Sequence, residues 1–170
     1  MSFAQGNPYD ILIPNFFIGD WECDLFKLTK SGIFVEYEIK TSVADFKKDF
    51  EKGNKEYVVE SQSSVKVNLK HDIIKSGERC NRFFFVCPSE IVHKIDVPDY
   101  CGLISYLSTS SDYGYFNLIK SARLMGEKRH DTLPMYREIA TSLAFREQIW
   151  RRKVFILEQS KKYDAQRGKI

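Results

Sequence analysis

Residues 34–40 have the sequence Phe-Val-Glu-Tyr-Glu-Ile-Lys, in which apolar and charged side chains alternate. An alternation with a period of two predicts a β-strand, because successive side chains of a strand point to opposite faces of its sheet. The charged residues of this strand, Glu36, Glu38 and Lys40, would share one face. The other face would pack into the core and would consist of Val35, Tyr37 and Ile39.

The preceding segment predicts a second strand that pairs with the first. Residues 21–28 are strand-like, and residues 29–32, Thr-Lys-Ser-Gly, supply the turn of a hairpin. Along this strand Glu22 and Asp24 share a face, so pairing of the two strands brings Asp24 close to Glu38, with Lys40 beside them. The hairpin therefore predicts two carboxylates and one lysine at a single place.

Such a group of side chains suits metal-assisted chemistry on a phosphate. Two neighbouring carboxylates repel each other unless a cation lies between them, and Mg²⁺ or Mn²⁺ is suited to oxygen ligands. The metal would polarise a phosphoryl oxygen and activate water, and Lys40 would stabilise the developing negative charge. The alternative interpretation is a solvated strand face that carries a cross-strand ion pair.

The remaining pattern predicts an α/β fold with a mixed central sheet flanked by helices and a long C-terminal helix. Residues 82–87 are almost continuously apolar, which is typical of a strand covered on both faces. Residues 103–107 and 115–119 would form a further hairpin. The other expected segments are an extended N-terminal arm over 1–20, a helix over 43–52, a polar loop over 51–64, a helical turn over 71–75 and a long helix over about 133–163.

Composition and charge exclude several classes of protein. The chain has 170 residues and a net charge of +3, which divides into −4 over residues 1–119 and +7 over residues 120–170. Its longest apolar run, residues 83–87, is far shorter than the roughly 20 residues of a membrane span, and no signal peptide is visible. The four cysteines are widely spaced, which argues against zinc and favours buried reduced thiols in a cytoplasmic protein.

The pattern Asp24-(13 residues)-Glu38-Ile39-Lys40 resembles the signature of the PD-(D/E)XK nuclease superfamily, which has the restriction-endonuclease-like fold. The surrounding sequence is similar to the MmcB-like DNA-repair branch and to related phage and bacterial proteins. The similarity covers roughly residues 14–150, and the segments that carry it are 21–25, 36–49, 70–71, 80–88, 98–104 and 142–146.

The resemblance implies a metal-dependent deoxyribonuclease that acts in DNA repair or in phage DNA processing. Asp24 and Glu38 would bind Mg²⁺ or Mn²⁺, and Lys40 would be the catalytic lysine. Three acidic residues are candidates to support the metal ligands without binding the metal themselves: Glu22, Asp45 and Asp49. For Asp45 and Asp49, acids favoured by the dipole at the start of a helix are the alternative. The superfamily's additional acidic residue on a leading helix has no direct counterpart here, and Asp10 and Glu22 are the candidates to replace it.

The basic C-terminal part is a candidate DNA-binding element, because duplex binding needs cations that neutralise phosphates. Its candidates are Arg123, Lys128, Arg129, Arg137, Arg146, Arg151, Arg152 and Lys153. The expected organisation is an arm over 1–20, a nuclease core over 21–120 and a basic helical extension over 121–170 that packs on the core. A homodimer is consistent with the resemblance. A catalytically inactive DNA- or protein-binding module on the same fold is the alternative function, and a solvated helix face is the alternative for the basic residues.

Overall fold

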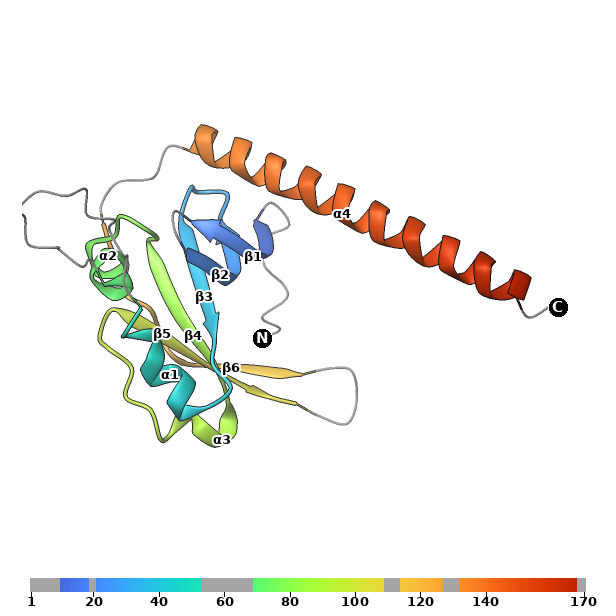
Figure 1. Ribbon diagram of the computed structural model, residues 1–170. Helices are drawn as coiled ribbons and strands as arrows, with labels where there is room; N and C mark the ends of the chain where they lie inside the picture. The colour runs from blue at the N-terminus through green and yellow to red at the C-terminus, as the bar shows by residue number, and fades with distance from the viewer. Residues whose placement is uncertain (1–9, 19–20, 53–68, 109–113, 127–131, 168–170) are drawn as a thin grey trace, which may run out of the picture. The chain divides into compact units, whose positions relative to one another are not determined.

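The computed structural model describes residues 10–18, 21–52, 69–108, 114–126 and 132–167. The chain divides into two units, residues 1–130 and residues 131–170. The first unit holds the sheet and the shorter helices, and the second holds the long helix (Figure 1). The predicted boundary at residue 120 therefore lies about ten residues before the division between the units.

Six strands form one mixed sheet in which neighbours in sequence are neighbours in space. The hairpins β1–β2, β2–β3 and β5–β6 are antiparallel, whereas β3, β4 and β5 run parallel to one another. The predicted α/β class with a mixed sheet is thus confirmed. The strands are β1 (Ile11–Ile18), β2 (Trp21–Leu28), β3 (Phe34–Ile39), β4 (Arg82–Pro88), β5 (Cys101–Leu107) and β6 (Tyr115–Lys120).

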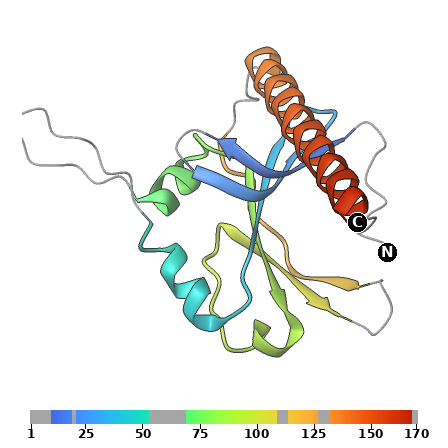
Figure 2. The ribbon, with the colours of Figure 1, turned by 45° about the vertical axis from the view of Figure 1, so that its right-hand side comes forward.

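Two helices of the parallel crossover between β3 and β4 cover one face of the sheet (Figure 2). They are α1 (Val43–Asp49) and α2 (Lys70–Ser76), and a short helix, α3 (Ser89–Val92), joins β4 to β5. Phe46 of α1 packs edge-on against Phe85 of β4, with ring centroids 4.8 Å apart. The ring of His71 in α2 also stacks on the ring of Phe85, with ring centroids 5.9 Å apart. The segment after α1 is joined to the start of α2, because the backbone N–H of Lys70 donates to the carbonyl of Lys52 at 2.8 Å.

The opposite face of the sheet carries an apolar cluster. Tyr37 stacks on Phe84 with ring centroids 5.4 Å apart, and Val35, Val86 and Ile104 are buried beside them. Side chains of β4 are buried on both faces, as the continuous apolarity of residues 82–87 predicts.

Three expectations need correction. Residues 11–18 of the expected N-terminal arm form β1, an edge strand of the sheet, where Pro14 is tolerated because an edge strand has one unpaired side. Ile39 was expected in the core but is 45% exposed, since it lies at the end of β3. The predicted helix over 43–52 ends at Asp49. Most of the loop expected at 51–64 lies outside the described residues.

The second unit contains α4 (Thr132–Arg167), which confirms the long C-terminal helix. Where its side chains are described, large apolar residues such as Trp150 and Phe155 are exposed, at 67% and 59%. Among the described helices, none is both long and apolar enough to cross a membrane. Packing of this extension on the core stays a prediction.

Gly77 ends α2 in a conformation that other residues adopt poorly. Its φ is +80°, and a Cβ atom at this position would lie 2.7 Å from the backbone nitrogen of Gly126. We therefore expect Gly77→Ala to lower the free energy of unfolding by about 1–3 kcal/mol, from left-handed strain and overpacking together. Urea denaturation measures the change. Gly114, where the nearest atom of the described residues to a Cβ would lie at 3.6 Å, is the matched control position.

Candidate functional site

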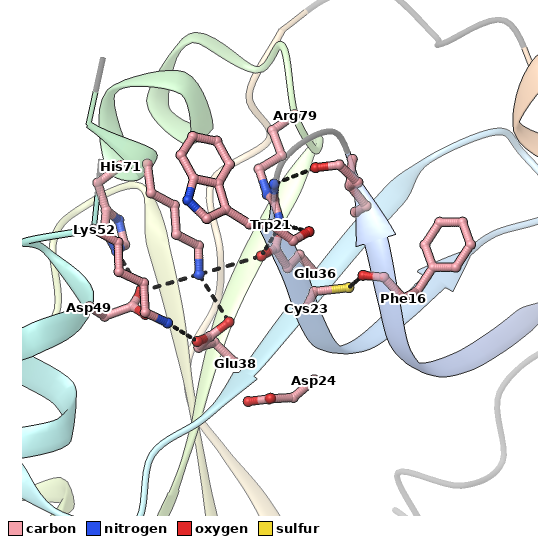
Figure 3. A network of polar contacts seen from close by, with 12 residues as sticks. Phe16, Trp21, Cys23, Asp24, Glu36, Glu38, Asp49, Lys52, His71 and Arg79 are labelled. Atoms are coloured by element: carbon pink, nitrogen blue, oxygen red, sulfur yellow. Dashed lines mark hydrogen bonds and ion pairs between the residues drawn. The ribbon is translucent and has the colours of Figure 1, made fainter. Parts of the chain in front are cut away.

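Glu38 lies near the carboxyl end of the central strand β3 and is buried at 3% exposure. Three ammonium groups bind its carboxylate. The contact with Lys52 is drawn in Figure 3. Oε1 accepts from Lys40 Nζ at 2.8 Å and from Lys52 Nζ at 2.9 Å. Oε2 accepts from Lys70 Nζ at 3.0 Å. The cations that neutralise this carboxylate therefore come from the residue after β3, from the segment after α1 and from the first residue of α2.

Asp49, at the end of α1, is fully buried and faces the same ammonium groups. Its Oδ1 lies 2.7 Å from Lys52 Nζ and 3.0 Å from Lys40 Nζ, although neither contact has good hydrogen-bond geometry. Its Oδ2 accepts from His71 Nε2 at 2.8 Å, and the hydroxyl of Tyr100 is 3.0 Å from His71 Nδ1. A carboxylate can only accept, so His71 Nε2 carries a proton and donates to Asp49.

Glu36 extends along β3 the network of charged side chains described above, which consists of Glu38, Asp49, Lys40, Lys52, Lys70 and His71. Its carboxylate receives a bidentate pair of hydrogen bonds from Arg79, with Nε at 2.6 Å and Nη2 at 3.1 Å. The same guanidinium donates to the carbonyls of Ile18 at 2.5 Å and Trp21 at 3.2 Å, and it stacks over the Trp21 ring at 5.2 Å. One buried arginine thus ties the loop before β4 to the ends of β1 and β2.

Asp24 of β2 is partly buried next to Glu38 (Figure 3). Its Oδ2 accepts from the backbone N–H of Ile39 at 2.6 Å, which fixes the carboxylate beside the end of β3. Burial raises the pKa of Asp24, and the charge of Glu38 raises it further, against the hydrogen bond from Ile39. Within the described residues, no cation forms an ion pair with Asp24, so its charge is left uncompensated at close range.

The other carboxylates of the network have the opposite shift. Burial alone would raise the pKa of Glu38, but the charge of Lys70 and hydrogen bonds from Lys40 and Lys52 outweigh it and lower the pKa. For Asp49 the hydrogen bond from His71 and the charge of Lys70 outweigh burial and hold the pKa far below its ordinary value. The pKa values of Lys40 and Lys52 are correspondingly raised by their carboxylate partners, which overcome the opposing effect of burial.

The predicted trio of Asp24, Glu38 and Lys40 is therefore brought together. In the described residues, no group of three or more His, Cys, Asp and Glu side chains is arranged to hold a metal ion. Mg²⁺, however, is commonly held by one or two carboxylates together with water or a substrate phosphate. The uncompensated carboxylate of Asp24 beside that of Glu38 provides such a pair. The donor set thus fits a hard divalent cation, provided that an ammonium group vacates Glu38.

The supporting acidic residues have different positions. Asp49 is at the centre of the network, as described above. Asp45 is half-exposed in the first turn of α1, with Oδ1 4.0 Å from Lys40 Nζ, so it borders the site. Glu22 is exposed, and no contact between it and the network is present among the described side chains. Asp10 pairs with Lys27 at 2.7 Å and does not supply the additional acid.

The candidate DNA-binding residues do not gather on one helix face. Since successive residues of a helix are rotated by about 100°, Arg137, Arg151 and Arg152 lie on one side of α4, and Arg146 and Lys153 lie roughly opposite. Arg151 is exposed and pairs with Glu147 at 2.7 Å. Arg123 is exposed in the segment after β6. Lys128 and Arg129 lie outside the described residues.

Sequence reasoning missed most of the cations of the network. Alternation along β3 placed Glu36 on the charged face, but nothing nearby in sequence indicated its partner Arg79. Lys70 and His71 come from α2, more than thirty residues beyond Glu36. The sequence feature that could have indicated them is a lysine followed by a histidine at the start of a short helix in the chain between β3 and β4. The four cysteines are buried and free, as expected.

Comparisons with known proteins provide a fold relationship. No family model matches the sequence, and no curated protein matches it. One solved structure that it resembles is the SPO1766 protein of unknown function from Silicibacter pomeroyi, with a TM-score of 0.54 and 19% sequence identity. The match covers 84% of this chain and 80% of that chain. At this identity the likeness concerns the fold alone.

Proposed function

We propose that the protein is a metal-dependent deoxyribonuclease with a restriction-endonuclease-like core, and that Asp24, Glu38 and Lys40 form its active site. The observation that carries the proposal is the convergence of these residues at the end of β3, with Asp24 fixed by the N–H of Ile39 at 2.6 Å. Asp24 and Glu38 would hold Mg²⁺ or Mn²⁺, which polarises the scissile phosphate and activates water when bound.

The chain's own residues supply position and charge. Lys40 is 3% exposed, and its ammonium is oriented by Glu38 Oε1 at 2.8 Å and Asp49 Oδ1 at 3.0 Å. A cation held at this place without further movement stabilises negative charge that develops on a phosphate. Lys70, at 1% exposure, neutralises the buried side of Glu38 and keeps that carboxylate ionised.

The test is cleavage of supercoiled plasmid by the full chain with Mg²⁺ or Mn²⁺. We expect Asp24→Asn to lower the rate about a hundredfold or more, because a metal ligand contributes several kcal/mol of transition-state stabilisation. Asp24 is preferable to Glu38 or Lys40 for this test, since it has no ion pair among the described residues whose loss would unfold the protein. Asp96→Asn, which changes an exposed aspartate outside the site, is the matched control. Cleavage that persists in EDTA, or equal rates for Asp24→Asn and the parent, would contradict the proposal.

A second candidate function is a catalytically inactive DNA- or protein-binding module on the same fold. The observation that favours it is that ammonium groups already bind both oxygens of Glu38. This function predicts an intact plasmid with every divalent metal. For a DNA-binding module, fluorescence anisotropy would detect association with a duplex that weakens steeply as salt rises.

A further inference from the structure

Lys52 differs from the other cations of the network in its exposure. Its side chain is 41% exposed, whereas those of Lys40, Lys70 and Arg79 are 4%, 1% and 2% exposed. Its ammonium nevertheless lies 2.9 Å from Glu38 Oε1 and 2.7 Å from Asp49 Oδ1. It is therefore a solvent-accessible cation that contacts the carboxylate expected to bind metal.

The ammonium of Lys52 can leave without movement of the backbone. The carbonyl of Lys52 accepts from the N–H of Lys70 at 2.8 Å, which attaches this point of the chain to α2. The side chain is a flexible four-carbon stem, so rotation about its own bonds takes the charged group into water. The buried lysines lack this route, because their ammonium groups are enclosed by the carboxylates and the sheet.

Charge balance makes such a departure necessary when a divalent ion binds. Four carboxylates, those of Asp24, Glu36, Glu38 and Asp49, are near four basic side chains, Lys40, Lys52, Lys70 and Arg79. Two further positive charges would repel the ammonium groups in a partly buried environment of low dielectric. Loss of the exposed ammonium reduces that repulsion and opens one of the two acceptor positions occupied at Glu38 Oε1, while Lys40 keeps the other. The departing ammonium regains its hydration.

We propose that Lys52 is an internal competitor of the divalent metal: its ammonium occupies one acceptor position of Glu38 Oε1, beside Lys40, and leaves when the metal binds. This inference rests on the proposed function, because it assumes a metal at Asp24 and Glu38. Competition is reciprocal, so Lys52 weakens metal binding by the same factor by which the metal weakens the Lys52 contacts. The protein would then require a higher concentration of free metal than its carboxylates alone would need.

Calorimetric titration of the full chain with Mn²⁺ measures this competition. Lys52→Met removes the ammonium but adds no oxygen that could bind metal, and we expect it to lower the Kd on the order of tenfold. Lys48→Met removes an exposed charge four residues earlier in the chain and should change the Kd less than about twofold, because solvent and salt screen it. Asp24→Asn in the Lys52→Met background should abolish binding, which locates the ion.

The outcomes separate this inference from the proposed function. Equal Kd values for the parent and Lys52→Met would overturn the competition and leave the metal site intact. No Mn²⁺ binding by either protein would overturn both the metal site and the competition. Binding by Lys52→Met alone would support the competition in its strongest form.

A second measurement uses the unmodified protein and does not depend on the stability of a variant. Amine-reactive labelling followed by mass spectrometry reports the accessibility of each lysine. Saturating Mg²⁺ should raise the labelling rate of Lys52 several-fold, because its ammonium loses two carboxylate partners, and should leave that of Lys48 unchanged. An unchanged rate at Lys52 under conditions where Mg²⁺ binds would overturn the inference.

Discussion

Replacement of Asp49 by asparagine should cause one of the largest losses of stability of any single substitution in this chain. The carboxylate is fully buried and lies within 3.4 Å of three ammonium groups and the ring of His71. An amide of the same shape leaves those cations with one carboxylate fewer in a region where water cannot replace it. Removal of one partner from a buried charge network costs about 3–5 kcal/mol.

The measurement is urea denaturation at neutral pH. Asp45→Asn on the same helix is the matched control, because that side chain is 46% exposed and only borders Lys40 at 4.0 Å. It should cost less than about 1 kcal/mol. Similar losses for the two variants would show that the network contributes far less to stability than its geometry indicates.

Acid should remove the same stabilisation from the parent protein. The folded-state pKa values of Asp49 and Glu38 lie below their ordinary values of 3.8 and 4.5. Depressed carboxyl pKa values stabilise the fold above the ordinary values, and this contribution is lost as the pH falls toward the folded ones. Asp24, whose pKa is raised, acts in the opposite direction. Asp49→Asn should therefore unfold with a weaker dependence on pH below about 4 than the parent. Parallel curves would contradict this assignment.

Replacement of Arg79 by methionine should produce a loss of similar size from the other end of the network. Glu36 has no exposure, and its bidentate partner would be gone, with Lys70 Nζ at 3.7 Å as its nearest other cation in an ion pair among the described residues. Two backbone carbonyls, of Ile18 and Trp21, would also lose their donor. We expect a loss of about 3–5 kcal/mol in urea denaturation.

The double variant Glu36→Met/Arg79→Met distinguishes two costs in stability: that of leaving the Glu36 carboxylate without its partner and that of lost packing. Replacement of both members of a buried pair by apolar residues is often neutral, so the double variant should be more stable than Arg79→Met. Arg82→Met, an exposed arginine three residues further along the chain, should stay within about 0.5 kcal/mol of the parent. A double variant less stable than Arg79→Met would show that the two positions are needed for reasons other than their mutual charge.

The fold was predictable where local patterns are strong. Alternation in residues 34–40 and the turn at 29–32 predicted the β2–β3 hairpin, whose register pairs Leu25 with Tyr37 and so directs Asp24 toward Glu38. The apolar run at 82–87 predicted a doubly covered strand. Residues 11–18 gave no such signal, because Pro14 is unfavourable in a strand and the edge position that tolerates it is a tertiary property.

The residues of the site were predictable only in part, because some of their contacts also depend on tertiary structure. A cation between Asp24 and Glu38 was expected on electrostatic grounds. Among the described residues, lysines instead bind Glu38, and none forms an ion pair with Asp24. In the sequence, α1 separates Lys52 from β3. Lys70 follows a segment of sixteen residues that the structure does not describe. Contacts made across such separations depend on the crossover between β3 and β4, which no local pattern encodes.

The hydrogen bond between the N–H of Lys70 and the carbonyl of Lys52 has a consequence for how this chain can vary in length. It brings together Lys52 and Lys70, the residues on either side of the interval 53–69. The entropy of closing a loop grows slowly with its length. Insertions or deletions within the interval should therefore be tolerated, which makes it a natural position for fusing a second domain or a reporter next to the site.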